Sequence, residues 1–76
     1  MKIKVLKIIN SIRESKGLSL LEELKPDMTL RNDLSLDSLE LAELTVRIED
    51  EFGIDIFEDK IIYSIDELFN KLSNDK

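Results

Sequence analysis

The sequence contains no cysteine and no histidine. The chain therefore has no thiolate nucleophile, no disulfide, no imidazole base and none of the soft ligands that zinc and copper sites prefer. Any bound metal would have to be a hard, oxygen-coordinated ion. With 76 residues, the chain is expected to form one small domain, residues 1–76, because two independent cores would not fit.

Long apolar runs are also missing. The apolar stretches are short and are interrupted by charged residues, as at Ile8-Ile9 and Leu20-Leu21. No segment therefore has the length and composition of a transmembrane helix. The basic start at residues 1–4 leads into no apolar core of a signal peptide. We expect a cytoplasmic protein without a membrane segment.

Basic residues are in the minority, with 11 Lys and Arg against 17 Asp and Glu and a net charge of −6. This balance argues against binding to a nucleic-acid backbone and favours basic protein partners. The charge is uneven, since residues 1–16 carry +4, residues 17–59 carry −10 and residues 60–76 are neutral. Such a run is usually only the solvated face of a helix, so its position relative to other features decides its meaning.

Apolar residues recur at helical spacing in three segments. The middle segment has the strongest pattern, with Asp37 as N-cap, Glu40 completing a capping box and Gly53 as the C-terminal stop. Ser64 and Glu67 repeat the capping box before the last segment. The predicted fold is all-α, a small three-to-four-helix bundle. The predicted helices span about residues 2–15, 37–52 and 65–72.

A long loop, residues 17–37, joins the first two predicted helices. Connections of this length are usually functional or contain an element of their own. A capping-box pattern predicts one helical turn at residues 19–22, and Leu30 and Leu34 are expected to pin the loop to the core. Residues 54–62 are predicted to form a buried connector with at most a short helical turn, because no second strand exists to pair with them.

Carboxylates are the only abundant titratable groups, and Asp33, Ser35 and Asp37 match the first ligand positions of a calcium-binding loop. The match then fails, since Ser38 stands where the loop needs glycine and Leu44 where it needs a bidentate glutamate. No metal site is predicted. Paired carboxylates for hydrolysis would need a concave pocket, which so short a bundle hardly provides. The chain is therefore not expected to be an enzyme.

Ser38 is the remaining candidate for chemistry. Asp37-Ser38-Leu39-Glu40 alone is typical of a well-capped helix start, and for an arbitrary four-residue match this interpretation is usually right. With no histidine to activate it, Ser38 cannot act as a nucleophile by itself. An anion attached to Ser38 would nevertheless lie at free backbone N–H groups and at the positive end of the helix dipole. A phosphodiester is predicted to be stabilised there.

Three stretches around Ser38 form a distinctive pattern: Asp33-Leu34-Ser35-Leu36-Asp37-Ser38-Leu39-Glu40-Leu41, Glu43-Leu44 and Ile48-Glu49-Asp50-Glu51-Phe52-Gly53-Ile54. In these stretches and over nearly its whole length, the chain resembles the acyl carrier protein family. The resemblance implies that Ser38, flanked by Asp37 and Leu39, is the attachment site of 4′-phosphopantetheine. A phosphopantetheinyl transferase would supply this arm from coenzyme A, and its thiol would hold an acyl group as a thioester.

The resemblance also gives the acidic charge a second interpretation. Family members use acidic residues of this helix to dock on basic patches of partner enzymes, and such long-range attraction raises association rates and weakens with salt. Leu39 and Val46 lie off the core stripe, where they could pack beneath the loop or form a small apolar contact between the acids. The residues predicted to dock partners are Glu40, Glu43, Val46, Glu49 and Asp50.

The apolar residues of the core stripes have two interpretations as well. Such residues more often form plain core, but in a carrier of fatty chains they could line an acyl tunnel between helices. The candidates for this pocket are Leu41, Leu44, Ile48, Ile56 and Leu68.

Several positions depart from the family pattern. Ser35 stands where glycine is common, residues 54–62 are shorter with Phe57 where proline is frequent, and Arg47 adds a positive charge to the acidic helix. The predicted function is a monomeric acyl carrier of fatty-acid synthesis or of a specialised polyketide, aminoacyl or cell-surface pathway. The alternative is an unmodified acidic helical adaptor that binds a basic partner without a prosthetic group.

Overall fold

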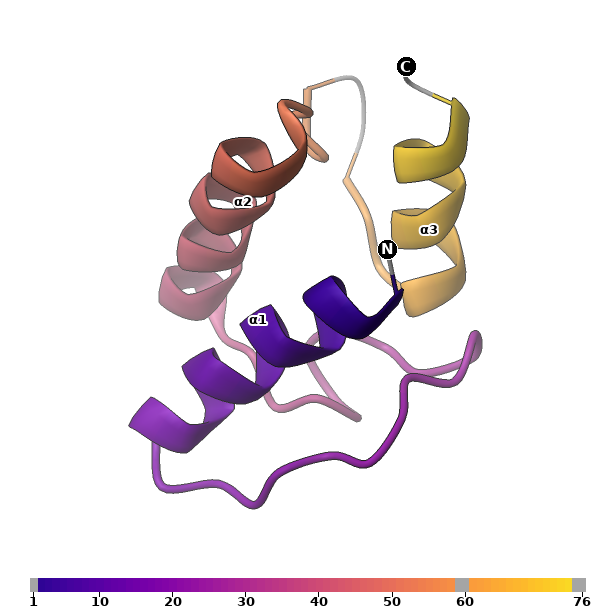
Figure 1. Ribbon diagram of the computed structural model, residues 1–76. Coiled ribbons are helices and arrows are strands. Elements are labelled where there is room, and N and C mark those ends of the chain that lie inside the picture. The colour runs from indigo at the N-terminus through magenta and orange to yellow at the C-terminus, as the bar shows by residue number, and fades with distance from the viewer. Residues whose placement is uncertain (1, 59–60, 75–76) are drawn as a thin grey trace.

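The computed structural model describes residues 2–58 and 61–74. Within these residues the chain forms three helices and no strand, α1 (Lys2–Ser15), α2 (Ser38–Phe52) and α3 (Ile65–Asn74). The predicted all-α bundle is confirmed, and α3 runs two residues past its predicted end. The long loop passes below α1 in the view of Figure 1 before it enters α2. None of the described helices is long and apolar enough to cross a membrane.

The core lies where the apolar stripes of the helices meet leucines from the loop. In α2, Leu44 and Ile48 are fully buried while Leu41 and Phe52 are half-buried, as their spacing predicts. Gly53 ends this helix in the left-handed conformation with φ 73°, which glycine adopts without a steric penalty. The buried apolar side chains are Val5, Ile9, Ile12, Leu30, Leu34, Leu36, Leu44, Ile48, Ile56, Ile62, Ile65, Leu68 and Leu72.

Apolar side chains and backbone hydrogen bonds tie the long loop to the core and to α3. Leu30 and Leu34 are buried, which confirms that they pin the loop. The Leu30 N–H donates to the Tyr63 carbonyl at 2.9 Å, and the Ile65 N–H donates to the Met28 carbonyl at 2.9 Å. An isolated antiparallel bridge lies between these two contacts. The loop is therefore fixed against the start of α3.

The predicted helical turn at residues 19–22 is wrong, because this part of the loop is irregular. Side chains of α1 bind the backbone groups of this segment. Asn10 Nδ2 donates to the Leu21 carbonyl at 2.9 Å and Asn10 Oδ1 accepts the Leu21 N–H at 2.8 Å. Arg13 Nε donates to the Ser19 carbonyl at 3.2 Å. These contacts satisfy the backbone without a helical turn.

The described residues between α2 and α3 form a turn and no helix. Ile56 is fully buried, and the Asp55 side chain accepts the Phe57 N–H at 3.0 Å. In its described part the predicted connector is confirmed as a turn with no helix, and it is buried at Ile56 and Ile62. The prediction also included residues 59 and 60, which lie outside the described residues.

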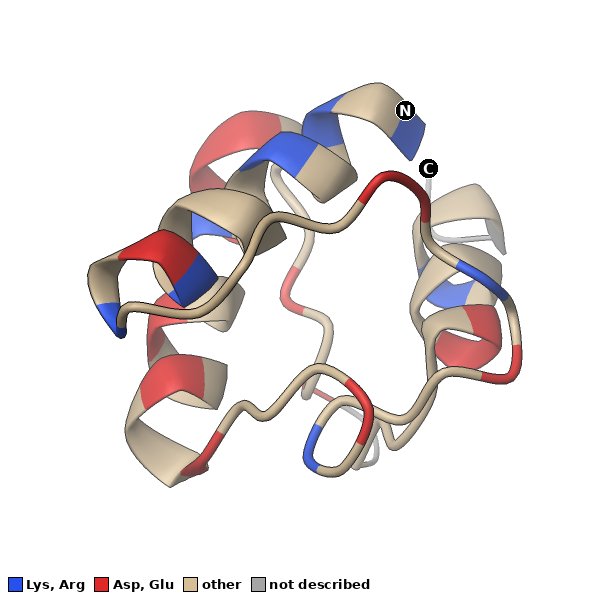
Figure 2. Cartoon of the chain, turned by 90° about the horizontal axis from the view of Figure 1, so that it is seen from below, with Lys and Arg blue, Asp and Glu red and all other residues tan. Residues whose placement is uncertain are grey.

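Polar contacts join α1 to α2 near both ends and in the middle of α2. Figure 2 shows that basic residues gather on α1 and acidic residues on α2. Part of the acidity of α2 is therefore neutralised within the molecule. The contacts are Lys4–Glu51 at 2.8 Å, Ser11–Arg47 at 3.0 Å and Lys16–Glu40 at 2.9 Å.

Arg13 is the buried polar link between α1 and the loop. Arg13 is only 7% exposed, and its Nη1 donates to the Leu34 carbonyl at 2.6 Å. Arg13 continues the buried stripe of Val5 and Ile9 by one more turn of the helix. Its guanidinium therefore lies on the core side of α1, where it satisfies carbonyl groups of the loop.

We expect Arg13→Met to lower the free energy of unfolding by about 2 kcal/mol, because the loop carbonyls lose a charged donor. Lys7→Met removes the same charge from an exposed position of α1 and should change the free energy by no more than about 0.5 kcal/mol. Urea unfolding of both variants measures the difference. Equal losses would show that Arg13 contributes only its charge.

Candidate functional site

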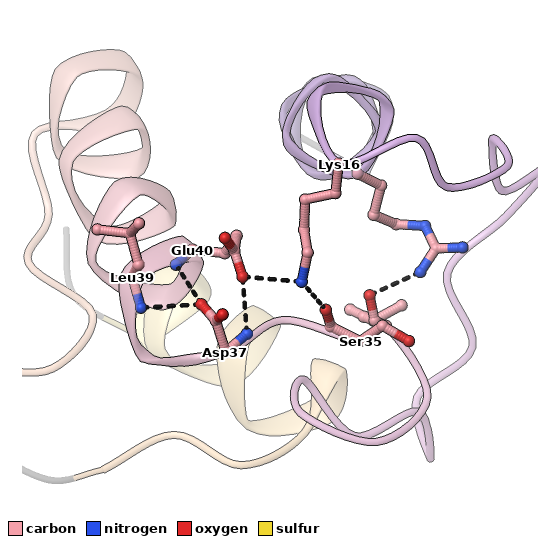
Figure 3. Close-up of polar contacts among 7 residues, drawn as sticks. Lys16, Ser35, Asp37, Leu39 and Glu40 are labelled. Carbon is pink, nitrogen blue, oxygen red and sulfur yellow. Dashed lines mark hydrogen bonds and ion pairs between the residues drawn. The ribbon is translucent and has the colours of Figure 1, made fainter.

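The candidate site lies at the start of α2, where Asp37 caps the helix (Figure 3). Asp37 Oδ1 accepts the N–H groups of Leu39 at 3.0 Å and of Glu40 at 3.1 Å. Glu40 Oε1 accepts the Asp37 N–H at 3.0 Å, which completes the predicted capping box. This reciprocal pair fixes where the helix begins, and it thereby fixes the position of Ser38.

Lys16 connects the end of α1, the loop and the first turn of α2 at one point (Figure 3). Its Nζ donates to Glu40 Oε1 at 2.9 Å and to the Ser35 carbonyl at 2.8 Å. The Glu40 side chain is consequently only 12% exposed. Its carboxylate serves the cap and the contact with Lys16.

The capping carboxylate stays ionised at neutral pH. Hydrogen bonding with Glu40 is the largest cause that holds the pKa of Asp37 below its ordinary value. Desolvation raises the pKa but is a smaller effect than the hydrogen bonds with Glu40, and the charge of Lys16 and the Leu39 N–H lower the pKa further. Because the pKa is lower in the folded chain, the contribution of the cap to stability is complete above about pH 4 and is lost as the pH falls through the lowered value.

Ser38 is the first residue of α2, and its side chain is exposed. Its Oγ accepts a hydrogen bond from Arg31 Nη2 at 3.0 Å. The prediction that the N–H groups at this helix start are free is partly wrong, because those of Leu39 and Glu40 already donate to the Asp37 carboxylate. The positive group beside the Ser38 hydroxyl is therefore the side chain of Arg31. No pattern in the sequence marks Arg31, because this residue lies in an irregular part of the loop.

A groove of about 220 Å³ opens beside this position. Leu41 of α2, Arg31 of the loop, and Ile61 and Tyr63 from the segment before α3 are among the residues that line it. Ile61 is 63% exposed and Tyr63 is 62% exposed. Leu41 is thus the member of the predicted acyl pocket that borders the groove. The other predicted members are fully buried in the core: Leu44, Ile48, Ile56 and Leu68.

The comparisons with known proteins point to one family. A family model described as "Phosphopantetheine attachment site" matches residues 7–68. The chain belongs to the acyl carrier protein family. A comparison with solved structures found no significant match.

Several relatives named "Acyl carrier protein" support this membership. The one from Nitratidesulfovibrio vulgaris strain Miyazaki F is 45% identical over 53 residues, covering 70% of this chain and 68% of the relative. The one from Nitratidesulfovibrio vulgaris strain DP4 is 38% identical over 71 residues, covering 86% of this chain and 92% of the relative. The one from Rickettsia bellii strain OSU 85-389 is 38% identical over 50 residues, covering 66% and 60%.

An acyl carrier protein is a carrier and not a catalyst, and it holds 4′-phosphopantetheine as a covalent prosthetic group. That group supplies a thiol, which the residues of this chain lack. The start of α2 fits such a group chemically, because it presents the exposed hydroxyl of Ser38 with the guanidinium of Arg31 beside it. The groove offers apolar surface beside Arg31, the residue whose guanidinium contacts this hydroxyl.

Leu39 and Val46 form an exposed apolar pair on α2. Leu39 is 75% exposed and Val46 is 64% exposed, so neither packs beneath the loop. They lie seven residues apart, with Glu43 between them and Asp50 one turn beyond, and this spacing places all four on one face of the helix. The structure thus brings most of the predicted docking residues to a common surface.

The acidic residues of α2 differ in how much of their charge is available to a partner. Glu43 pairs with Arg47 at 2.8 Å. Glu49 and Asp50 are exposed, and no ion pair forms at either among the described residues. The available negative charge of the predicted set therefore lies in the second half of the helix, away from the capped end.

Ser35 has a left-handed backbone with φ 59°, a conformation that costs a non-glycine residue about 1–2 kcal/mol. We expect Ser35→Gly to raise the melting temperature by about 4 °C. Ser19→Gly, in an exposed part of the loop that lacks a positive φ, should not raise it. Thermal unfolding compares the two variants. An equal rise in both would mean that strain at Ser35 is not the cause.

Proposed function

We propose that Ser38 carries the 4′-phosphopantetheine arm and that the chain presents acyl groups, held on the arm as thioesters, to biosynthetic enzymes. The position of Ser38 carries this proposal. Its exposed hydroxyl stands inside the Asp37-Ser38-Leu39 motif at the first residue of a helix. Because Asp37 provides the cap, the Ser38 hydroxyl is not needed to hold the helix start and is accessible to a modifying enzyme.

The attachment needs a separate phosphopantetheinyl transferase, because the chain has no histidine or cysteine that could activate the hydroxyl. Ser38 Oγ forms a bond to the phosphorus of coenzyme A that bears the pantetheine. The bond from this phosphorus to the oxygen of the adenosine bisphosphate breaks, and the leaving group takes the electron pair. The hydroxyl proton passes to a base of the transferase, and a phosphodiester remains on Ser38.

The absence of cysteine has a consequence for the proposed function. The sequence offers no thiol of its own, so the thiol at the end of the arm has no competitor within it. An acyl group on the arm therefore cannot migrate to a cysteine side chain of the chain, and it leaves by transfer to a partner enzyme or by hydrolysis.

We further propose that the groove receives part of the arm or a short acyl group. Its apolar surface comes from Leu41, Ile61 and Tyr63, and it borders the attachment residue through Arg31. Its volume of about 220 Å³ is below the range of about 300–1,000 Å³ that is usual for pockets enclosing a drug-sized ligand. A short segment fits this size better than a long fatty chain does.

Partner enzymes are proposed to dock on the exposed face of α2, which we call the docking surface and define as Leu39, Glu43, Val46, Glu49 and Asp50. Apolar contact at Leu39 and Val46 would add to charge attraction from Glu49 and Asp50. Basic patches on the partners match this chemistry. Glu40, although predicted to dock partners, is placed outside the surface because its carboxylate binds Lys16 and the Asp37 N–H.

The proposed class of pathway is fatty-acid synthesis or a specialised polyketide, aminoacyl or cell-surface route. The relatives share the name "Acyl carrier protein" and are consistent with either class. A monomeric state and a cytoplasmic location stay predictions from the sequence.

Incubation with coenzyme A, magnesium and a broad-specificity phosphopantetheinyl transferase should add the mass of one phosphopantetheinyl group to the wild-type chain. Ser38→Ala should gain no mass, because the accepting hydroxyl is gone. Ser35→Ala, which removes an exposed serine of the loop just before α2, should be modified like the wild type. Intact-protein mass spectrometry reads all three. An unmodified wild type would favour the adaptor alternative, and equal modification of Ser38→Ala would place the arm elsewhere.

Neutralising two acids of the docking surface, with Glu49→Gln and Asp50→Asn together, should slow modification by the transferase about tenfold at low salt. The loss should largely disappear at high salt, where exposed charges are screened. Glu22→Gln with Glu23→Gln removes the same charge from exposed loop residues and serves as the control. Initial rates at both salt concentrations test the proposal, and equal slowing of the two double variants would count against a localised surface.

A further inference from the structure

A phosphodiester on Ser38 would add a second negative charge beside the Asp37 carboxylate, a consequence that rests on the proposed function. The carboxylate of Asp37 lies at the same helix end and occupies the N–H groups of Leu39 and Glu40 at 3.0 and 3.1 Å. Those N–H groups would otherwise be the natural donors to an anion at a helix start. The new negative charge therefore needs a donor that the capping box has not already used.

Arg31 provides such a donor. Its Nη2 donates to Ser38 Oγ at 3.0 Å, the atom that would bear the phosphorus. Within the described part of the chain no carboxylate lies within ion-pair distance of Arg31. The nearby acid in the sequence, Asp33, is engaged with Thr29, whose N–H and hydroxyl both donate to it, at 2.8 and 3.2 Å. Among the described residues the guanidinium therefore has no acidic partner.

The backbone around Arg31 is held in place on both sides. The Leu30 N–H donates to the Tyr63 carbonyl at 2.9 Å, and the Asp33 and Leu34 N–H groups both donate to the Thr29 carbonyl at 3.1 Å. Leu30 and Leu34 are buried. Arg31 thus extends from an anchored turn. Little backbone order has to be imposed when its side chain binds a ligand.

We propose that Arg31 is the positioning residue for the phosphodiester of the arm, pairing with the non-bridging oxygens once Ser38 is modified. A guanidinium presents its donors in a planar fork that matches phosphate oxygens, and the charged hydrogen bonds formed are stronger than neutral ones. The contact that Arg31 makes with the Ser38 hydroxyl in the unmodified chain is replaced by a contact with an anion. Attachment of the arm therefore stabilises the fold through Arg31.

The test compares unmodified and fully modified forms of the wild type, Arg31→Gln and Arg47→Gln. Arg47→Gln removes the same charge at a position of α2 that lies nine residues after Ser38, and it is the matched control. In the wild type, attachment should raise the melting temperature by about 3 °C at low salt and by less at high salt. Arg31→Gln should lose most of this rise, whereas Arg47→Gln should keep it. An undiminished rise in Arg31→Gln would overturn the proposal.

Phosphorus NMR gives a second measurement that does not depend on unfolding. The phosphodiester signal of the modified chain should shift in Arg31→Gln and stay in place in Arg47→Gln, because only the former removes a group in contact with the phosphate. Equal shifts in the two variants, or none, would overturn the pairing. Failure of the wild type to accept the arm at all would be seen first by mass spectrometry and would overturn the proposed function itself.

Discussion

The hydrogen bonds that Arg13 donates to carbonyl groups of the long loop are the contacts on which the placement of Ser38 depends. Ordering about twenty loop residues costs conformational entropy, and this loop contains no helix that would satisfy its own backbone. Arg13 compensates by binding the Leu34 carbonyl at 2.6 Å from a buried position on α1. Leu34 lies four residues before Ser38, and Lys16 fixes the carbonyl of Ser35 between them. The end of α1 thus sets where α2 can begin.

The same arrangement divides the charge of α2 into two parts. Basic residues of α1 and the adjoining Lys16 neutralise the edge of α2 that faces them, including the capping residue Glu40. The exposed second half keeps Glu49 and Asp50. The edge of α2 that faces α1 is consequently built for internal order, and the exposed acids Glu49 and Asp50 for long-range attraction. A partner drawn to Glu49 and Asp50 would not have to break the contacts that hold Ser38 in position.

Features that depend on short spacing along the chain were predictable from the sequence. The capping box of Asp37 and Glu40 and the stop at Gly53 involve residues within one turn of each other, so local chemistry decides them. The proposed attachment residue, Ser38, could be singled out from the sequence because its motif is contiguous. The contacts of Asn10 with Leu21 and of Arg31 with Ser38 join irregular segments to residues 11 and 7 positions away. Periodicity in the sequence does not predict such pairs. At residues 19–22 a capping-box pattern predicts a helical turn, but contacts of this kind hold the segment in an irregular conformation.

The loop also explains how an acidic motif can accept another negative charge. The lowered pKa of Asp37 keeps its carboxylate ionised, so a phosphodiester on Ser38 would join an existing anion at the same helix end. Two cations flank this position from separate parts of the chain, Lys16 bound to Glu40 and Arg31 bound to Ser38. Lys16 balances the capping box, which leaves Arg31 for the added charge. Asp37 could therefore cap the helix and remain charged while Ser38 carried the proposed arm.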